Sequence, residues 1–297
     1  MNQNCLISEE NVYSGALGCR GCGWSLLVRH LSSILGEETV YVVPASCFSI
    51  ISGPYPMNAL KGTIVHTLFA AASATATGVR AALDRKGNKK TQVVVLAGDG
   101  GTFDIGLQAL SGAAARGEDI IYVCNNNGAY MNTGVQTSTA TPYGAVTTTN
   151  PSGKMTWPKN LVELVAAHNI PYLATGSLAY LKDLQSKIKK ANEKNGFRFI
   201  MIDGPCPPGH KYPPEMSIEI ARMAVESNLF PLLEVEDGKY KLNYVPKKHV
   251  PVDKVLKMQG RFSNLFSNGS DSNLHQVQNW VDKEWNALLE KAHVKTI

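Results

Sequence analysis

Short apolar segments rich in Val and Ile alternate with longer segments of helical periodicity along the first two thirds of the chain. Each apolar segment is bounded by Gly, Asp or Asn, which is typical of buried strands. The segments between them place apolar residues at the spacing of one helix face. The pattern predicts strands at residues 38–43, 92–98, 119–125 and 197–204, and helices at 24–36, 66–83, 103–117, 160–169 and 177–194.

This alternation predicts an α/β fold with a mostly parallel, doubly wound sheet. Continuously apolar strands separated by helices are typical of a sheet that helices cover on both faces. Ligands of such sheets bind at the carboxyl ends of the strands. The segments GDGG and CNNNGAYMNTG fall at two of these ends, so they are the first candidates for a binding site.

The last part of the chain has a different pattern. From Pro231 it is rich in lysine, with a predicted hairpin in EVEDGKYKLNY and one or two amphipathic helices that end near Ile297. We therefore divide the chain into a cofactor-binding domain, residues 1–230, and an extension, residues 231–297, that packs on the domain or on a partner. The loop of residues 137–159 is long and rich in Thr, Gly and Pro, and loops of this length are more often functional than idle.

Composition narrows the class of protein. The chain has 297 residues, of which 44% are hydrophobic and 18% charged, as in soluble globular proteins. It has no apolar run of about 20 residues that could cross a membrane, and its start lacks the features of a signal peptide. We expect a cytoplasmic protein without membrane association. A net charge of +5 does not indicate a nucleic-acid partner.

The GDGG segment, Gly98 to Gly101, follows a predicted strand and begins a predicted helix. Glycines let a ligand approach the backbone, and a helix N-terminus favours anions, so the segment can hold a diphosphate. Asp99 would repel a bare phosphate but can share a divalent cation with it. Mg²⁺ commonly takes one or two carboxylates together with phosphate oxygens.

The next predicted strand ends at a cluster of amides, twenty-eight residues after Asp99. There Asn127 can offer its side-chain oxygen and Ala129 its backbone carbonyl to the same cation. The alternative is that GDGG and NNNG are two ordinary turns. Because both follow buried strands at this separation, we favour a Mg²⁺ and diphosphate site.

A larger match supports this site. The segment GDGGTFDIGLQALSGAAARGEDIIYVCNNNGAYMNTGVQTSTATPYGA resembles the beta subunit of 2-oxoacid:ferredoxin oxidoreductases, the pyruvate enzyme in particular, and the resemblance extends from about residue 15 to about residue 210. It implies a diphosphate-binding domain for thiamine diphosphate. The chain departs from the family at Asn126-Asn127-Gly128, where relatives usually carry Asp-Asn-Glu.

The resemblance also implies roles for individual residues. It places Mg²⁺ on Asp99, Asn127 and the carbonyl of Ala129. It places Met131 and Asn132, in the MNTG turn, at the cofactor, with Asn132 reaching the thiazolium and the reacting carbonyl carbon. The glycines that would cradle the diphosphate are Gly98, Gly100 and Gly101.

The Cys-x-x-Cys pair in GCRGCG has several possible uses. Its spacing suits a redox disulfide, half of a zinc site or part of an iron–sulfur site. In a reducing compartment thiols are ligands or buried residues more often than disulfides. The resemblance implies a [4Fe–4S] cluster beside the thiamine, with the ligands Cys19, Cys22, Cys47 and Cys206.

Cys5 and Cys124 are expected to be ordinary small residues. Zinc on the four other thiolates remains the competing hypothesis. A cluster is favoured because it can accept electrons from the thiamine site, whereas zinc has no redox chemistry.

The reaction implied by the resemblance is pyruvate, coenzyme A and oxidised ferredoxin giving acetyl-CoA, CO₂ and reduced ferredoxin, in either direction. Alternatives are oxalate or another 2-oxoacid as the substrate, or a non-redox thiamine-dependent subunit with structural zinc. The resemblance implies that a glutamate on a separate pyrimidine-binding domain activates the aminopyrimidine, and we expect no such second α/β domain in this chain. We therefore expect an alpha subunit with a pyrimidine-binding domain and a small ferredoxin-like subunit as partners, besides soluble ferredoxin and coenzyme A.

Overall fold

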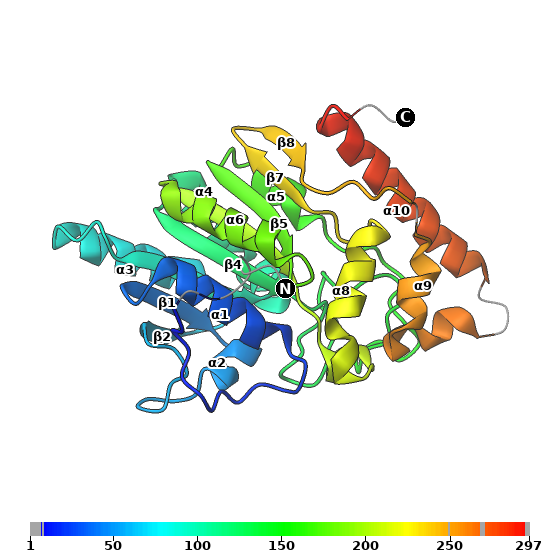
Figure 1. Cartoon of the computed structure of the whole chain (residues 1–297), viewed down its shortest axis with the longest axis horizontal. Coiled ribbons are helices and arrows are strands. Elements are labelled where there is room, and N and C mark those ends of the chain that lie inside the picture. The colour runs from blue at the N-terminus through cyan, green and yellow to red at the C-terminus, as the bar shows by residue number, and fades with distance from the viewer. Residues whose placement is uncertain (1–6, 8, 249, 268–270, 295–297) are drawn as a thin grey trace.

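A single sheet of eight strands forms the centre of the computed structural model, which describes residues 7, 9–248, 250–267 and 271–294 (Figure 1). The strand order is β2-β1-β3-β4-β6-β5-β7-β8; the first six strands are parallel, and β7 and β8 extend one edge in antiparallel pairing. The strands are β1 (Thr39–Pro44), β2 (Thr63–Thr67), β3 (Gln92–Gly98), β4 (Ile120–Asn126), β5 (Tyr172–Ser177), β6 (Phe197–Asp203), β7 (Leu233–Glu236) and β8 (Lys239–Leu242).

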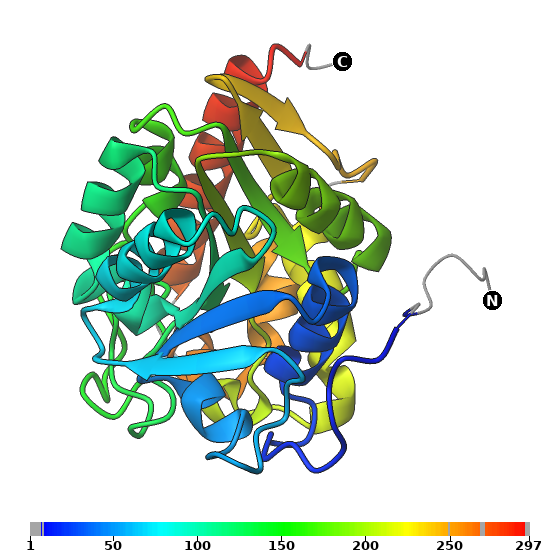
Figure 2. The ribbon, with the colours of Figure 1, turned by 90° about the vertical axis from the view of Figure 1, so that its left-hand side faces the viewer.

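Helices cover both faces of the parallel part of the sheet (Figure 2). They are α1 (Gly23–Leu35), α2 (Cys47–Ile51), α3 (Ala72–Arg85), α4 (Leu107–Arg116), α5 (Leu161–Ala166), α6 (Leu181–Glu193), α7 (Pro207–His210), α8 (Ser217–Glu226), α9 (Val252–Lys257) and α10 (Asp271–Lys291). A π-helix covers Gly100–Asp104, and 3-10 helices cover Pro214–Met216 and Gly260–Phe266.

Strand β3 shows how the pattern builds two apolar cores. Successive side chains of a strand point to opposite faces. Val93 and Val95 pack with α3, α4 and α5, whereas Val94 and Leu96 pack with α1, α2 and α6. The continuous run of apolar residues that predicted a doubly covered strand therefore serves both layers, and the predicted fold class is confirmed.

Three of the predicted elements need correction. The helix predicted at 66–83 begins only at Ala72, because His66 and Thr67 end strand β2. The helix predicted at 103–117 is preceded by a π-helix and begins at Leu107. The helix predicted at 177–194 begins at Leu181, after strand β5, which we did not predict.

The predicted hairpin of the C-terminal region exists as β7 and β8, and it pairs with β5 and so continues the main sheet. Beyond it, α9 and α10 pack with the loop around Tyr143 in a separate apolar cluster. The division of the chain at residue 231 stays a prediction. Among the described residues, no helix is long and apolar enough to cross a membrane.

Candidate functional site

The GDGG turn joins β3 directly to a helix, as the sequence predicted. Gly98 ends the strand, and the π-helix starts at Gly100, with Ile105 N–H donating to the Gly100 carbonyl at 3.3 Å. π-helical turns are rare and often mark functional sites. The first turn of such a helix leaves N–H groups free for an anion.

The two glycines that flank Asp99 serve different purposes. A Cβ atom on Gly100 would lie 2.5 Å from the Tyr130 ring, so no side chain fits there. A Cβ atom on Gly98 would meet nothing closer than Cβ of Ser46 at 3.9 Å. Gly100 is therefore needed for packing, whereas the backbone at Gly98 is open to a ligand.

Asp99, Asn127 and Ala129 converge as predicted from the sequence. The terminal amide atom of Asn127 lies 2.9 Å from Oδ1 of Asp99 and 3.0 Å from the carbonyl oxygen of Ala129. With the amide nitrogen in that place, both contacts are hydrogen bonds. With the amide oxygen there, that atom and the two oxygens beside it are the kind of ligands that a divalent cation takes.

The two separations fit Mg²⁺. Octahedral ligands at 2.0–2.1 Å from the ion stand about 3 Å from one another, and the Asn127 amide atom stands at that distance from both oxygens. Burial raises the pKa of Asp99 to about 7, and the hydrogen bond from Ser138 opposes that rise. A cation at this point would compensate a buried carboxylate that is otherwise costly to ionise.

The long loop of residues 137–159 holds this turn in place. Ser138 Oγ donates to Oδ2 of Asp99 at 2.5 Å. The hydroxyl of Thr139 donates to Asp104, and Lys159 donates to the carbonyl of Phe103. The loop of residues 137–159 therefore holds both ends of the π-helix in place.

His210 and Arg261 both contact the backbone of Asn127. His210 Nε2 lies 2.7 Å from the carbonyl oxygen of Asn127, and Arg261 Nη1 donates to the same oxygen at 3.4 Å. Burial lowers the pKa of His210 well below its usual range, so the ring is neutral and donates from Nε2. A Cβ atom on Gly128 would lie 3.3 Å from Arg261 Nη1. The guanidinium thus stands beside Gly128, where the family resemblance led us to expect a glutamate.

Met131 and Asn132 lie on a turn that Tyr130 and Gln136 close through backbone hydrogen bonds. Asn132 is exposed, and its predicted role at the thiazolium stays a prediction. A Cβ atom on Gly209 would lie 2.2 Å from Met131 Sδ and 3.2 Å from Cys206 Sγ. The turn that carries Met131 therefore packs through this side chain against the helix that follows Cys206.

The four cysteines singled out in the sequence face one region. Burial is the largest cause that raises the pKa of Cys47 to about 12. The next causes are the charges of Cys206, Cys22 and Cys19. Gly23 N–H donates to the carbonyl of Pro205 at 3.2 Å, which ties the Cys-x-x-Cys loop to the Cys206 segment. The Asp99 carboxylate also acts on Cys47, so the thiols lie beside the proposed metal site.

Backbone N–H groups act on the pKa of two of these thiols. Burial raises the pKa of Cys22, which precedes α1, and the backbone N–H groups of Trp24 and Ser25 oppose that rise. Burial raises the pKa of Cys206, which precedes α7, to about 11, and the backbone N–H of Gly209 opposes that rise.

The positions of the four cysteines also bear on whether they would hold a zinc ion instead of a [4Fe–4S] cluster. Four thiolates on one zinc ion, each about 2.3 Å from the metal, stand about 3.8 Å apart. Within the part of the chain that the structure describes, no three His, Cys, Asp or Glu side chains converge closely enough to hold one metal ion. A [4Fe–4S] cluster takes one thiolate on each of four irons, so its ligands can stand farther apart. Four cysteine thiolates are a donor set that suits either zinc or a [4Fe–4S] cluster.

Sequence reasoning missed Ser138, His210 and Arg261. Ser138 stands in the Thr-rich loop and His210 in the segment PCPPGH. Neither has a spacing to other residues that would indicate a place in the binding site. Arg261 lies in the extension and carried no signal. Cys124 is buried in β4, as expected, and Cys5 lies outside the described residues.

Comparison with known proteins gives one consistent assignment. Residues 45–202 match the family model of the C-terminal thiamine pyrophosphate-binding domain of thiamine pyrophosphate enzymes. Subunit VorB of the ketoisovalerate oxidoreductase of Pyrococcus horikoshii is 45% identical over 96% of this chain and 94% of its own. Subunit PorB of the pyruvate synthase of Methanocaldococcus jannaschii is 41% identical over 94% of this chain and 97% of its own.

A solved structure agrees with the two relatives. It is the 2-oxoglutarate:ferredoxin oxidoreductase of Magnetococcus marinus, with 2-oxoglutarate, coenzyme A and succinyl-CoA bound. The match has a TM-score of 0.60 and 25% identity, and it covers 74% of this chain and 81% of that one. Together with the fold and the converging oxygens, these likenesses show that the chain belongs to the family of thiamine-dependent 2-oxoacid:ferredoxin oxidoreductase beta subunits.

Proposed function

We propose that the chain is the thiamine-diphosphate- and [4Fe–4S]-binding subunit of an enzyme that converts pyruvate, coenzyme A and oxidised ferredoxin to acetyl-CoA, CO₂ and reduced ferredoxin, reversibly. The observation that carries the proposal is the meeting of the Asp99 carboxylate, the Asn127 amide and the Ala129 carbonyl at the start of a helix. Family membership and the adjacent thiols support it.

In this proposal Asp99, Asn127 and Ala129 hold Mg²⁺, and the helix start from Gly98 to Gly101 holds the diphosphate. Bound thiamine diphosphate supplies an electron sink for the carbanion that remains when a 2-oxoacid loses CO₂. The chain itself supplies orientation, since Ser138 fixes the Asp99 carboxylate and Tyr130 packs over Gly100. Exposed Asn132 is the proposed contact with the reacting carbon.

A [4Fe–4S] cluster on Cys19, Cys22, Cys47 and Cys206 would accept electrons singly. The backbone N–H groups at Cys22 and Cys206 would stabilise its negative charge. Met131, between the cofactor turn and Cys206, would exclude water from the space between them. These are roles for side chains that the fold already brings together.

Ketoisovalerate is the second candidate substrate. The VorB relatives are named for it and are 45% identical to this chain, compared with 41% for a PorB relative. A site that holds a branched acyl chain and one that holds a methyl group differ by a few carbon atoms, and hydrophobic pockets discriminate such differences by only about 10–200-fold. A substrate panel therefore has to include both acids.

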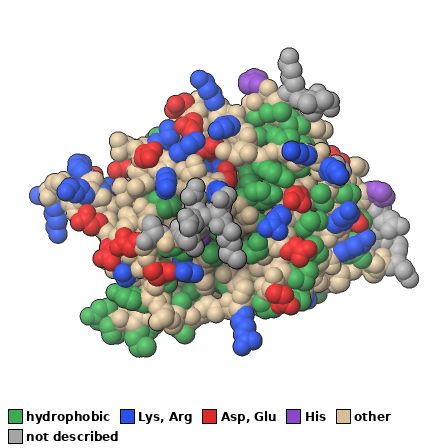
Figure 3. Space-filling model, viewed as in Figure 1, with side chains coloured by type: hydrophobic (Ala, Val, Ile, Leu, Met, Phe, Trp, Pro, Cys, Tyr) green, Lys and Arg blue, Asp and Glu red, His purple; other side chains and the backbone are tan. Residues whose placement is uncertain are grey.

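The partners in this proposal are an alpha subunit with a pyrimidine-binding domain, a small ferredoxin-like subunit and soluble ferredoxin. An exposed apolar surface supports a partner at one end of the molecule. Tyr55 is 94% and Met57 80% exposed in the loop after α2, and apolar side chains gather over this region at the lower left of Figure 3. Large exposed apolar groups close together are typical of interaction sites.

The test is reconstitution. The chain, loaded anaerobically with iron, sulfide, Mg²⁺ and thiamine diphosphate, should not turn over pyruvate with coenzyme A, because in this proposal the alpha subunit supplies the carboxylate that activates the aminopyrimidine. Adding the alpha and ferredoxin-like subunits should restore reduction of ferredoxin. Substantial activity of the chain alone at the same cluster content would refute the half-site proposal.

A further inference from the structure

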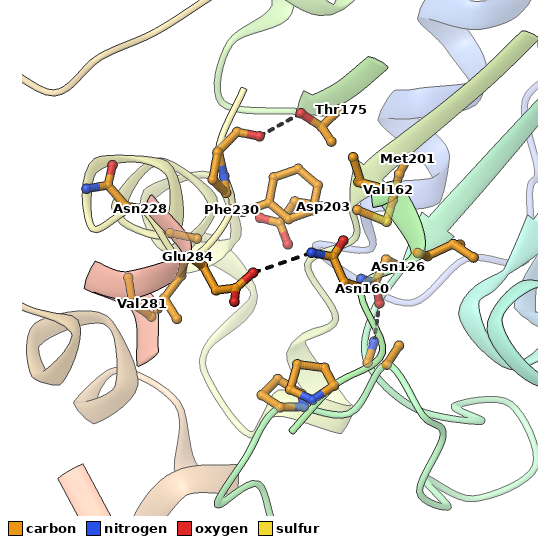
Figure 4. A pocket seen from close by; sticks show the side chains of 18 of the residues that line it. Asn126, Asn160, Val162, Thr175, Met201, Asp203, Asn228, Phe230, Val281 and Glu284 are labelled. Atoms are coloured by element: carbon orange, nitrogen blue, oxygen red, sulfur yellow. Dashed lines mark hydrogen bonds between the residues drawn. The ribbon is translucent and has the colours of Figure 1, made fainter. Parts of the chain in front are cut away.

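A cavity of about 450 Å³ lies between the carboxyl ends of β5 and β6 and the helices α8, α9 and α10 (Figure 4). Cavities of this size are in the range that holds small organic molecules. Its walls are mainly apolar, with Phe230, Val162, Val281 and Leu256 among them. Asn127 and Gly128 also belong to the wall, so the cavity adjoins the candidate metal site.

Six charged side chains line the cavity, and four of them, Lys159, Glu163, Glu284 and Lys291, have partners in the described part of the chain. The other two, Asp203 and Arg261, carry opposite charges. Asp203, at the end of β6, lies beside Phe230 in Figure 4. No described residue donates a hydrogen bond to its carboxylate, and burial raises its pKa to about 7. Arg261 also lines the cavity, where burial lowers its pKa to about 10.

The two charges do not satisfy each other. They attract one another electrostatically, yet no ion pair within 4 Å joins Asp203 to Arg261 in the described part of the chain. Arg261 donates from Nε to Gln259 at 3.0 Å and from Nη1 to the carbonyl of Asn127, which uses two of its five N–H groups. The side-chain oxygen of Asn228, also on the cavity wall, is buried without a partner.

Deeply placed charges are costly unless they are paired. A ligand with only a carboxylate would leave Asp203 unpaired, and a ligand with only an ammonium would leave the free N–H groups of Arg261 unpaired. A molecule with both charges and an apolar body would satisfy both residues and the walls. We propose that this cavity binds a free α-amino acid with an apolar side chain, its ammonium on Asp203 and its carboxylate on Arg261.

This site adjoins the candidate metal site, but binding of an amino acid can be measured without turnover and therefore tests the proposal directly. Isothermal titration of the full-length chain, together with the subunits that accompany it, uses L-valine, L-leucine and L-phenylalanine as probes. At least one should bind once per chain. Isobutylamine and isovalerate, each lacking one of the charged groups of valine, and the corresponding analogues of the other two, should bind at least 10-fold more weakly. Failure of all three amino acids to bind at 10 mM, or equal binding of a singly charged analogue, would overturn the proposal.

Variants locate the site. Asp203→Asn and Arg261→Met should each weaken binding at least 10-fold, as expected for a lost charge-assisted contact. Asp237→Asn removes the same charge from an exposed turn of the hairpin and should leave affinity unchanged. If a cavity variant does not fold, a crystal structure with the bound amino acid decides. Density between Asp203 and Arg261 supports the site, whereas only water there, or the amino acid elsewhere, refutes it.

Discussion

The hydroxyl of Ser138 donates a hydrogen bond of 2.5 Å to Oδ2 of Asp99, a residue thirty-nine positions earlier in the chain. The other oxygen, Oδ1, faces Asn127 at 2.9 Å. The carboxylate is therefore held with one oxygen on the loop and the other toward the proposed Mg²⁺. Contacts of this kind orient metal ligands and commonly change metal affinity 10–100-fold.

Replacing Ser138 with Ala should raise the Mg²⁺ concentration needed for half-maximal thiamine diphosphate binding by about 10-fold. The reason is that Asp99 loses the group that fixes its rotamer. Cofactor binding can be followed by quenching of tryptophan fluorescence while Mg²⁺ is titrated. Ser138→Thr keeps the hydroxyl and should recover most of the affinity; unchanged Mg²⁺ dependence in Ser138→Ala would contradict the role.

The glycines at Gly98 and Gly100 should respond differently to a methyl group. Gly100→Ala places Cβ 2.5 Å from the Tyr130 ring and should lower the free energy of unfolding by about 1–3 kcal/mol, as overpacking does. Gly98→Ala has room in the folded chain, so it should keep its stability and lose cofactor affinity. Thermal melts and cofactor titrations of the pair separate the two effects, and normal cofactor binding by Gly98→Ala would exclude a diphosphate at that backbone.

Single Ser substitutions of Cys19, Cys22, Cys47 or Cys206 should each lower the iron and acid-labile sulfide content and abolish ferredoxin reduction. Each removes one thiolate from a four-thiolate site. Cys124→Ala is the matched control, because this thiol is buried in β4 and should leave iron unchanged. Iron analysis of anaerobically purified protein provides the measurement. Full occupancy in the Cys206 variant would exclude it as the fourth ligand.

The antiparallel edge of the sheet depends on Glu234. Burial raises the pKa of this carboxyl, but hydrogen bonds from Asn243, Lys190 and Tyr172 more than offset burial and lower the pKa to about 2. Glu234→Gln should therefore cost about 2–3 kcal/mol at pH 7.

The sign of the pH dependence follows from a lowered pKa. The stabilisation is present above the unfolded value of 4.5 and is lost as the pH falls toward 2. The difference between wild type and Glu234→Gln, measured by urea unfolding, should shrink by about half between pH 7 and pH 3. Glu215→Gln, on an exposed residue, should show no such trend. A stability difference between wild type and Glu234→Gln that does not change with pH would contradict the lowered pKa of Glu234.

The sequence was most informative at the points where an apolar strand ends in polar or small residues. The strands β1, β3, β4 and β6 were predictable because Val and Ile dominate them and Gly, Asp or Asn ends them. The oxygens of Asp99, Asn127 and Ala129 were predictable because parallel strand ends meet at one edge of a sheet.

Other features depend on tertiary contacts that the sequence does not reveal. Strand β5, YLATGS, has few β-branched residues and is held by its neighbours β6 and β7. Strand β2 is short and ends within a segment that continues into a helix. Arg261 reaches Asn127 from 134 residues away, and no local pattern indicates such a contact.

Ferredoxin reduction by the complete enzyme, with wild-type chain or Asp99→Ala at matched iron content, tests the central claim most directly. With pyruvate or ketoisovalerate and coenzyme A, the wild-type complex should release CO₂ and reduce ferredoxin. Asp99→Ala should keep its cluster, lose Mg²⁺-dependent thiamine diphosphate binding and reduce no ferredoxin. Wild-type turnover in the Asp99 variant, or no reduction of ferredoxin by the wild-type complex with any 2-oxoacid, would contradict the account.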